Sequence, residues 1–190
     1  MTWADHGHRG RGVLRWTMDL FQSSERPIPA QAPQTELAMP SVDAIDQLHV
    51  VLMGRPGGDL GTPGHWLADL GAKVLWLPPD LVTLADLTEG LPQETRAPLT
   101  HALIDLEALG GIALACDALL ALRNQRPDLA VILVSCEFQS NDFSVERLAL
   151  CDASLRAPVV FSALEFAVSE ARDVNNPQWI KRLTDLGPRA

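Results

Sequence analysis

A glycine-rich segment offers the clearest place for binding chemistry in this sequence. It runs from Gly54 to Gly61, directly after a short apolar run and before a helix-like stretch. At such a turn, backbone N–H groups and a helix N-terminus can hold a phosphate, and Gly57, Gly58 and Gly61 are the residues that would approach it. The segment matches neither G-x-G-x-x-G nor G-x-x-x-x-G-K-[ST], and Asp59 would repel phosphate. A nucleotide or phosphate sensor is therefore an alternative prediction for this chain.

The cysteines and histidines do not form the spacing patterns of metal sites or catalytic pairs. Three cysteines lie in separate apolar stretches, at Cys116, Cys136 and Cys151. No C-x-x-C pair joins them, so we expect small buried thiols in a reducing compartment and no metal site. Three histidines begin separate predicted elements, at His49, His65 and His101. Neutral, half-buried imidazole rings are the expectation for them.

Composition and charge exclude several classes of partner. The chain has 190 residues, of which 15 are Lys or Arg and 24 are Asp or Glu, and its formal net charge is -9. Binding to nucleic acid or to an anionic membrane surface needs clustered cations, so neither is expected. No apolar run reaches the roughly 20 residues of a membrane-spanning helix, and the N-terminus lacks the apolar core of a secretory signal. We therefore expect a soluble, cytoplasmic protein.

Residues 1–46 differ in composition from the rest of the chain. Residues 22–41 contain four prolines among Ser, Gln and Ala, which predicts a flexible linker. Before this linker, an apolar-spaced stretch contains Leu14, Trp16, Leu20 and Phe21. Such a stretch could form a short amphipathic helix that docks either on a partner or on the domain itself.

From Leu48 onward, apolar runs of strand length alternate with helical stretches. Strands are predicted at 49–53, 73–77, 101–106, 129–134 and 153–156. Helices are predicted at 62–70, 81–87, 112–124, 144–151 and 161–172, with Thr62 as the N-cap of the first. Strands that are apolar throughout and separated by helices indicate a parallel sheet covered on both faces. We expect a doubly wound α/β domain, a five-stranded parallel sheet in a three-layer sandwich, at 47–173, followed by a polar C-terminal tail at 174–190.

Three sequence motifs, in order, resemble those of the receiver domain of two-component response regulators. The first is the run from Ala102 to Glu107, followed by two glycines and a long helix, and the others are residues 126–135 and 151–159. The resemblance covers residues 48–172 and implies the CheY-like variant of the flavodoxin fold. It also implies that Asp105 stands where receivers carry the phospho-accepting aspartate, and Ser135 where their fourth strand ends in Ser or Thr.

The chain departs from the receiver pattern at the groups that handle phosphate. Two acidic residues end the first strand of a working receiver and hold Mg²⁺, whereas this chain reads Leu52-Met53-Gly54-Arg55-Pro56. The lysine before the last-strand proline is replaced by Ala157, and Arg156 should point to the opposite face because side chains alternate along a strand. Phosphoryl transfer depends almost entirely on positioning and charge. We therefore expect no cofactor, with Mg²⁺ disfavoured, and a structural role for Asp105.

The sequence favours a degenerate receiver-like signalling module, a non-enzymatic protein-interaction domain that works without phosphorylation. In receivers, partners bind the surface of the fourth helix, fifth strand and fifth helix. The residues that the resemblance places on this face are Ser154, Arg156, Pro158, Val159 and Phe161. We expect another signalling protein as the partner, with a homodimer as a further option. The other alternative is a phosphoacceptor receiver whose atypical site is built from Asp59, Asp105 and Glu107.

Overall fold

The computed structural model describes residues 48–89 and 99–186. The predicted N-terminal extension, with its Trp16 stretch, lies outside the described residues, as does most of the loop that precedes the third strand. Within the described ranges, no helix is both long enough and apolar enough to cross a membrane.

All five strands lie in one parallel sheet. They are β1 (His49–Met53), β2 (Lys73–Leu77), β3 (His101–Asp105), β4 (Ala130–Ser135) and β5 (Ala153–Arg156). Their order across the sheet is β2-β1-β3-β4-β5, and every neighbouring pair is parallel. The prediction of a doubly wound, five-stranded parallel sheet is therefore confirmed.

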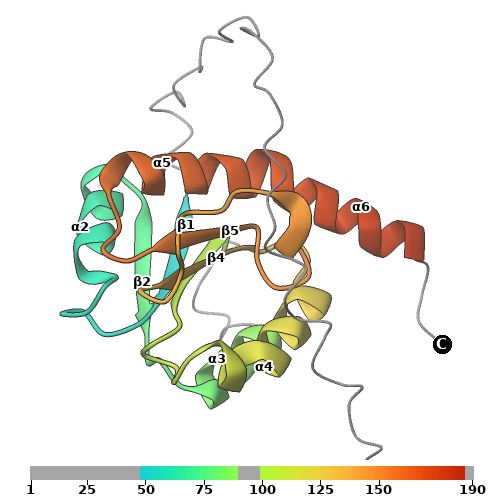
Figure 1. Cartoon of the computed structure of the whole chain (residues 1–190), viewed down its shortest axis with the longest axis horizontal. Helices are drawn as coiled ribbons and strands as arrows, with labels where there is room; N and C mark the ends of the chain where they lie inside the picture. Colours follow the sequence, from blue (N-terminus) through green and yellow to red (C-terminus); the bar gives the residue numbers. More distant parts are fainter. Residues whose placement is uncertain (1–47, 90–98, 187–190) are drawn as a thin grey trace, which may run out of the picture. The chain divides into compact units, whose positions relative to one another are not determined.

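Helices cover both faces of the sheet, as Figure 1 shows. They are α2 (Gly61–Asp69) and α5 (Phe161–Glu170) on one face, and α3 (Leu81–Glu89) and α4 (Ile112–Gln125) on the other. Leu103 of β3 belongs to the core beneath α2 and α5, whereas its neighbour Ile104 belongs to the core beneath α3 and α4. Because successive side chains enter opposite cores, both must be apolar, which explains the continuous apolar runs of the strands.

The segment between β4 and β5 differs from its prediction. The helix expected at 144–151 is replaced by a loop with one 3₁₀ turn, Val145–Arg147. Before that turn, Asp142 forms an antiparallel bridge with Ser154 of β5, exchanging two backbone hydrogen bonds of 2.8 Å. Arg147 reinforces the bridge, because it pairs with the Asp142 carboxylate at 3.2 Å and donates to Ser154 Oγ at 3.2 Å. The loop is thus held against the edge of the sheet, where its backbone cannot wind into a longer helix.

The last helix extends beyond the end that the sequence predicts. Helical backbone continues from α5 through a π-helical segment, Ala171–Asn175, into α6 (Asn176–Leu186), nearly in line with α5 in Figure 1. Asn175 Nδ2 donates to the carbonyl of Asp152 at 2.6 Å, and Trp179, which is 8% exposed, donates from Nε1 to the carbonyl of Arg123 at 3.0 Å. Residues 174–186, expected as a polar tail, are therefore a packed helix of the domain.

A fully buried ion pair joins α4 to the residues before β5. Nη1 and Nη2 of Arg123 bind the two carboxylate oxygens of Asp152 at 2.7 and 2.8 Å, and both side chains are 0% exposed. The guanidinium also donates to the carbonyls of Leu148 and Leu129. Its Cζ lies 5.2 Å from the centre of the Trp179 ring. One charged centre therefore links α4, the loop before β5 and α6.

His101 is fully buried at the start of β3, not half-buried as expected. Its Nδ1 lies 2.9 Å from Thr100 Oγ1, and its Nε2 lies 3.0 Å from the carbonyl oxygen of Val168 on α5. Burial lowers the pKa of His101 from 6.5 to about 4. The imidazole is therefore neutral in the folded protein at physiological pH.

We expect acid to weaken the fold through His101. Between pH 6.5 and about 4, the unfolded chain binds a proton that the folded chain excludes, so the free energy of unfolding falls as the pH falls, by about 3 kcal/mol for this group. Urea unfolding at a series of pH values measures this slope. His101→Gln should remove that part of the slope, and His65→Gln, at an exposed position of α2, should retain it. An unchanged slope in His101→Gln would contradict the assignment.

Candidate functional site

The topology brings two predicted segments together at the carboxyl edge of the sheet. β1 lies between β2 and β3, so the connections that leave β1 and β3 diverge to opposite faces of the sheet. In open α/β sheets this switch point is where ligands bind. Asp105 is the last residue of β3, and the glycine loop that follows β1 lies beside it.

Asp105 is enclosed by this glycine loop. Asp105 is only 4% exposed, and its Oδ1 accepts a hydrogen bond from the N–H of Ala108 at 3.0 Å. A Cβ on Gly54 would lie 3.2 Å from Asp105 Cβ, and one on Gly58 would lie 3.6 Å from Asp105 Oδ2. The lack of side chains on the loop therefore allows it to approach the carboxyl group closely.

Three carboxylates meet at this edge. One oxygen from each of Asp59, Asp105 and Glu107 lies within 4.8 Å of the others. Burial raises the pKa of Asp105, and the neighbouring negative charges of Asp59 and Glu107 raise it further. Carboxylate oxygens are the ligands that Mg²⁺ and Ca²⁺ prefer. The arrangement could therefore hold a divalent cation, which would relieve the repulsion among the three groups.

Glu107 already has partners on β4 and beyond it. Its Oε1 accepts hydrogen bonds from Ser135 Oγ at 2.5 Å, from the Cys136 N–H at 3.1 Å and from Cys136 Sγ at 3.4 Å. Partial burial by itself raises the pKa of Glu107. The hydrogen bonds outweigh it and lower the pKa, and the bond from Ser135 contributes most among them. The Ser135 hydroxyl is thus directed at a carboxylate of the same chain. Cys136 is exposed, in contrast to its prediction as a buried thiol, whereas Cys151 is buried.

Cations do not neutralise the three carboxylates within the part of the chain that the structure describes. Arg55 and Gly57 are exposed, and none of the ion pairs among the described residues involves Arg55. Arg156 Nη1 donates to the carbonyl of Gln139 at 2.8 Å, whereas Ala157 belongs to the core beneath α2 and α5. The prediction that Arg156 points away from the face of Ala157 stays a prediction, since both residues line one pocket.

The glycine loop closes on itself before α2 begins. The Gly58 N–H donates to the carbonyl oxygen of Arg55 at 2.8 Å, and the Gly61 N–H donates to the carbonyl oxygen of Gly58 at 2.9 Å. The helix starts at Gly61 with Leu60 as its N-cap, not at the predicted Thr62 cap. A Cβ on Gly61 would lie 2.5 Å from the carbonyl oxygen of Pro56, so glycine is required there. Two of the three predicted phosphate-binding N–H groups are therefore engaged within the loop.

The residues that the resemblance places on an interaction face differ in exposure. Ser154 is 0% exposed and Val159 is 9% exposed, so both pack inside the domain. Arg156, Pro158 and Phe161 are exposed. Of these five residues, the surface therefore presents one cation, one proline ring and one aromatic ring.

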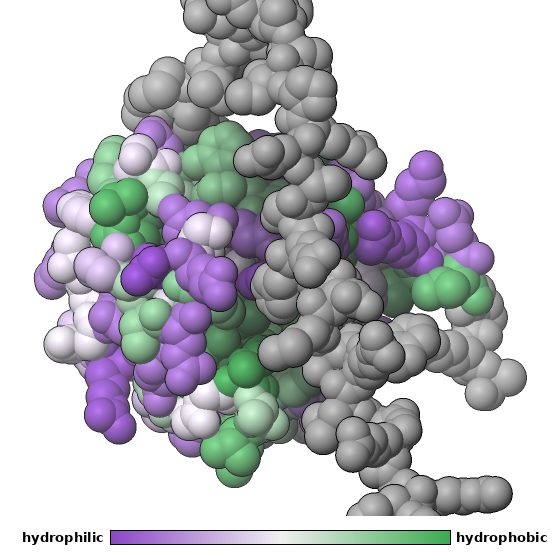
Figure 2. All heavy atoms as spheres, in the orientation of Figure 1, coloured by the Kyte–Doolittle hydropathy of each residue, from purple (hydrophilic) through white to green (hydrophobic). Residues whose placement is uncertain are grey.

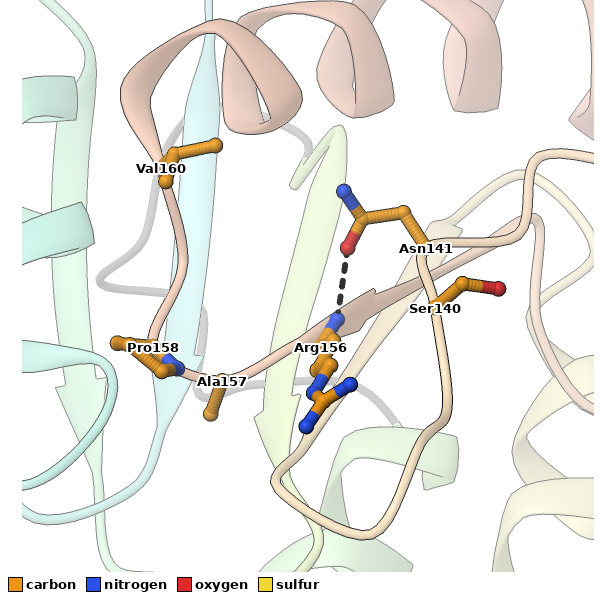
Figure 3. A pocket seen from close by; sticks show the side chains of 6 residues that line it. All are labelled: Ser140, Asn141, Arg156, Ala157, Pro158 and Val160. Carbon is orange, nitrogen blue, oxygen red and sulfur yellow. Dashed lines mark hydrogen bonds between the residues drawn. The ribbon is translucent and has the colours of Figure 1, made fainter.

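An open pocket lies beside these exposed residues, at the carboxyl end of β5. Its volume is about 520 Å³, and it is lined by Ser140, Asn141, Arg156, Ala157, Pro158 and Val160. Figure 3 shows Pro158 and Val160 on one side of the view and Ser140 and Asn141 on the other, with Ala157 and Arg156 between them. Sequence reasoning missed Ser140 and Asn141. Their positions depend on the bridge that holds the preceding loop against β5, which no local sequence pattern indicates.

Comparisons with known proteins find similarity among solved structures. No protein-family model matches this chain, and no curated protein matches it. Among solved structures, a pilus assembly-related protein from Burkholderia pseudomallei is 21% identical, with a TM-score of 0.49, over 67% of this chain and 90% of that chain. The five-stranded parallel sheet itself is compatible with a CheY-like fold.

Proposed function

We propose that this chain is a degenerate receiver-like module of cytoplasmic signalling, which binds a partner protein without being phosphorylated. The proposal combines the order of the three receiver-like motifs with the strand order β2-β1-β3-β4-β5. It assigns no catalytic step to the chain.

The main support for this proposal is the environment of Asp105, which stands at the phosphoacceptor position of receivers. Asp105 is enclosed beneath the glycine loop, and burial raises its pKa. Ser135 is directed at Glu107. Phosphoryl transfer needs positive charge around the transferring group, and the described residues surround Asp105 with negative charge instead.

A second candidate function follows from the three carboxylates. Because Asp59, Asp105 and Glu107 can each present an oxygen to one point, a bound Mg²⁺ would supply the positive charge that the site otherwise lacks. In that case Asp105 would be a phosphoacceptor with a rebuilt metal site. Glu107 would then have to keep or exchange its hydrogen bond from Ser135.

An amide NMR titration separates the two candidates. The whole chain is titrated with Mg²⁺ into the millimolar range and then with beryllofluoride, a mimic of the phosphoryl group. We expect no saturable shifts at Gly58, Asp105 and Ser135, because the glycine loop closes over Asp105 and Glu107 already accepts hydrogen bonds from Ser135 and Cys136.

Two variants control this titration. Asp105→Asn removes the acceptor, and Asp117→Asn removes an exposed carboxylate on α4. Saturable shifts that Asp105→Asn abolishes and Asp117→Asn preserves would refute the first candidate and establish the second.

A further inference from the structure

The pocket beside β5 is held open by hydrogen bonds within the domain. The Arg156 N–H donates to Asn141 Oδ1 at 2.8 Å (dashed in Figure 3), and Arg156 Nη1 donates to the carbonyl of Gln139 at 2.8 Å. The bridge between Asp142 and Ser154 fixes the next residues of the same loop. The polar wall of the pocket is therefore preorganised, which reduces the entropy lost when a ligand binds.

Arg156 brings positive charge to this pocket. Four other arginines in the described ranges pair with an aspartate: Arg123, Arg126, Arg147 and Arg172. The side-chain hydrogen bond of Arg156 goes instead to a neutral carbonyl, and the pocket lining contains no carboxylate. In a chain of net charge -9, this exposed guanidinium favours an acidic group.

An apolar rim continues from the pocket onto α5. Val160 is 56% exposed and Phe161 is 39% exposed, and they follow Pro158 after the buried Val159. The Phe161 ring is held edge-on against Trp66 of α2, with ring centres 5.5 Å apart. Arginine and aromatic side chains that are already fixed in place are common at the centres of protein interfaces.

We propose that this pocket binds a segment of a partner protein in which a carboxylate side chain lies beside an apolar side chain. The carboxylate binds the Arg156 guanidinium and the Ser140 hydroxyl, and the apolar side chain packs on Pro158, Val160 and Phe161. This inference rests on the proposed interaction function and adds the chemistry of the partner to it.

Selection from a random peptide display library, with the whole chain as bait, tests this chemistry. We expect enrichment of peptides that carry Asp or Glu next to a large apolar residue. The tightest peptide is then synthesised as the probe, and its amide shifts should map to residues 139–142 and 156–161. Arg156→Gln should weaken its binding about tenfold or more, because a charged hydrogen bond is lost. Arg55→Gln changes an exposed arginine of the glycine loop and should leave the affinity unchanged.

The other outcomes overturn the inference in distinguishable ways. A library that yields no acidic-apolar peptides, or a probe that binds Arg156→Gln as tightly as the natural chain, refutes the pocket assignment. Shifts that map to another face refute the pocket but leave the interaction function standing. Shifts at 156–161 that follow protein concentration without peptide identify a second copy as the occupant. Binding that requires beryllofluoride refutes the proposed independence from phosphorylation.

Discussion

Replacing Arg123 by methionine is expected to lower the free energy of unfolding by about 3–5 kcal/mol, since it leaves a buried carboxylate without its partner. Asp152 is 0% exposed, and its Oδ2 would retain the hydrogen bond from the Val131 N–H at 2.7 Å. The Leu148 carbonyl would lose its hydrogen bonds from Arg123, and the Leu129 carbonyl would retain the one from Asn176 Nδ2 at 3.3 Å. Urea unfolding followed by circular dichroism measures the change.

The chain offers a matched control for this substitution. Arg126, three residues later, pairs with Asp128 at the surface at 3.0 Å, and Arg126→Ala should cost less than about 1 kcal/mol. The double variant Arg123→Met/Asp152→Leu should recover part of the loss, because both buried charges are then gone. Equal effects of Arg123→Met and Arg126→Ala would show that the buried pair does not stabilise the fold.

Trp179→Ala is expected to lower the free energy of unfolding by about 3–5 kcal/mol, the usual cost of removing a large buried aromatic side chain. Trp179 is 8% exposed, its Nε1 donates to the Arg123 carbonyl, and its ring lies against the Arg123 guanidinium. Its neighbour Ile180 is 41% exposed, so Ile180→Ala is the control and should cost less than about 1 kcal/mol. Urea unfolding of both variants makes the comparison.

Trp179 and Arg123 should also be coupled to each other. Because the two side chains are in contact, the double variant should lose less stability than the sum of the two single variants. If Trp179→Ala costs no more than Ile180→Ala, then α6 contributes little to the fold, contrary to its packing in the structure.

The sheet could be predicted from the sequence because its strands carry their own signal. The three central strands, β1, β3 and β4, are buried on both sides, so Val50 to Met53 and Val131 to Val134 read as unbroken apolar runs. The end of the domain could not be predicted in this way. The π-helical segment shifts the helical register between α5 and α6, and it places two polar residues, Asn175 and Asn176, at buried positions beside Trp179. Figure 2 shows mainly hydrophilic residues on the visible face of α6.

The candidate site was only partly predictable for a similar reason. Asp59, Asp105 and Glu107 follow β1 and β3, and parallel strands end at the same edge, so their meeting could be expected. The bond from Ser135 to Glu107 joins residues 28 apart in the chain and depends on side-chain rotamers. The pocket at β5 depends on a loop whose path follows from the pairing of Asp142 with Ser154.

The pairing of Asp142 with Ser154 also limits how copies of this protein can associate. A strand at the margin of a sheet normally exposes a row of unpaired N–H and C=O groups, on which another chain can add a strand and begin to aggregate. Here the outward N–H and C=O of Ser154 bind Asp142, and the outward N–H of Arg156 binds Asn141 Oδ1. This border of the sheet is therefore closed to strand addition from another molecule, and a partner that reaches it must bind side chains instead of backbone.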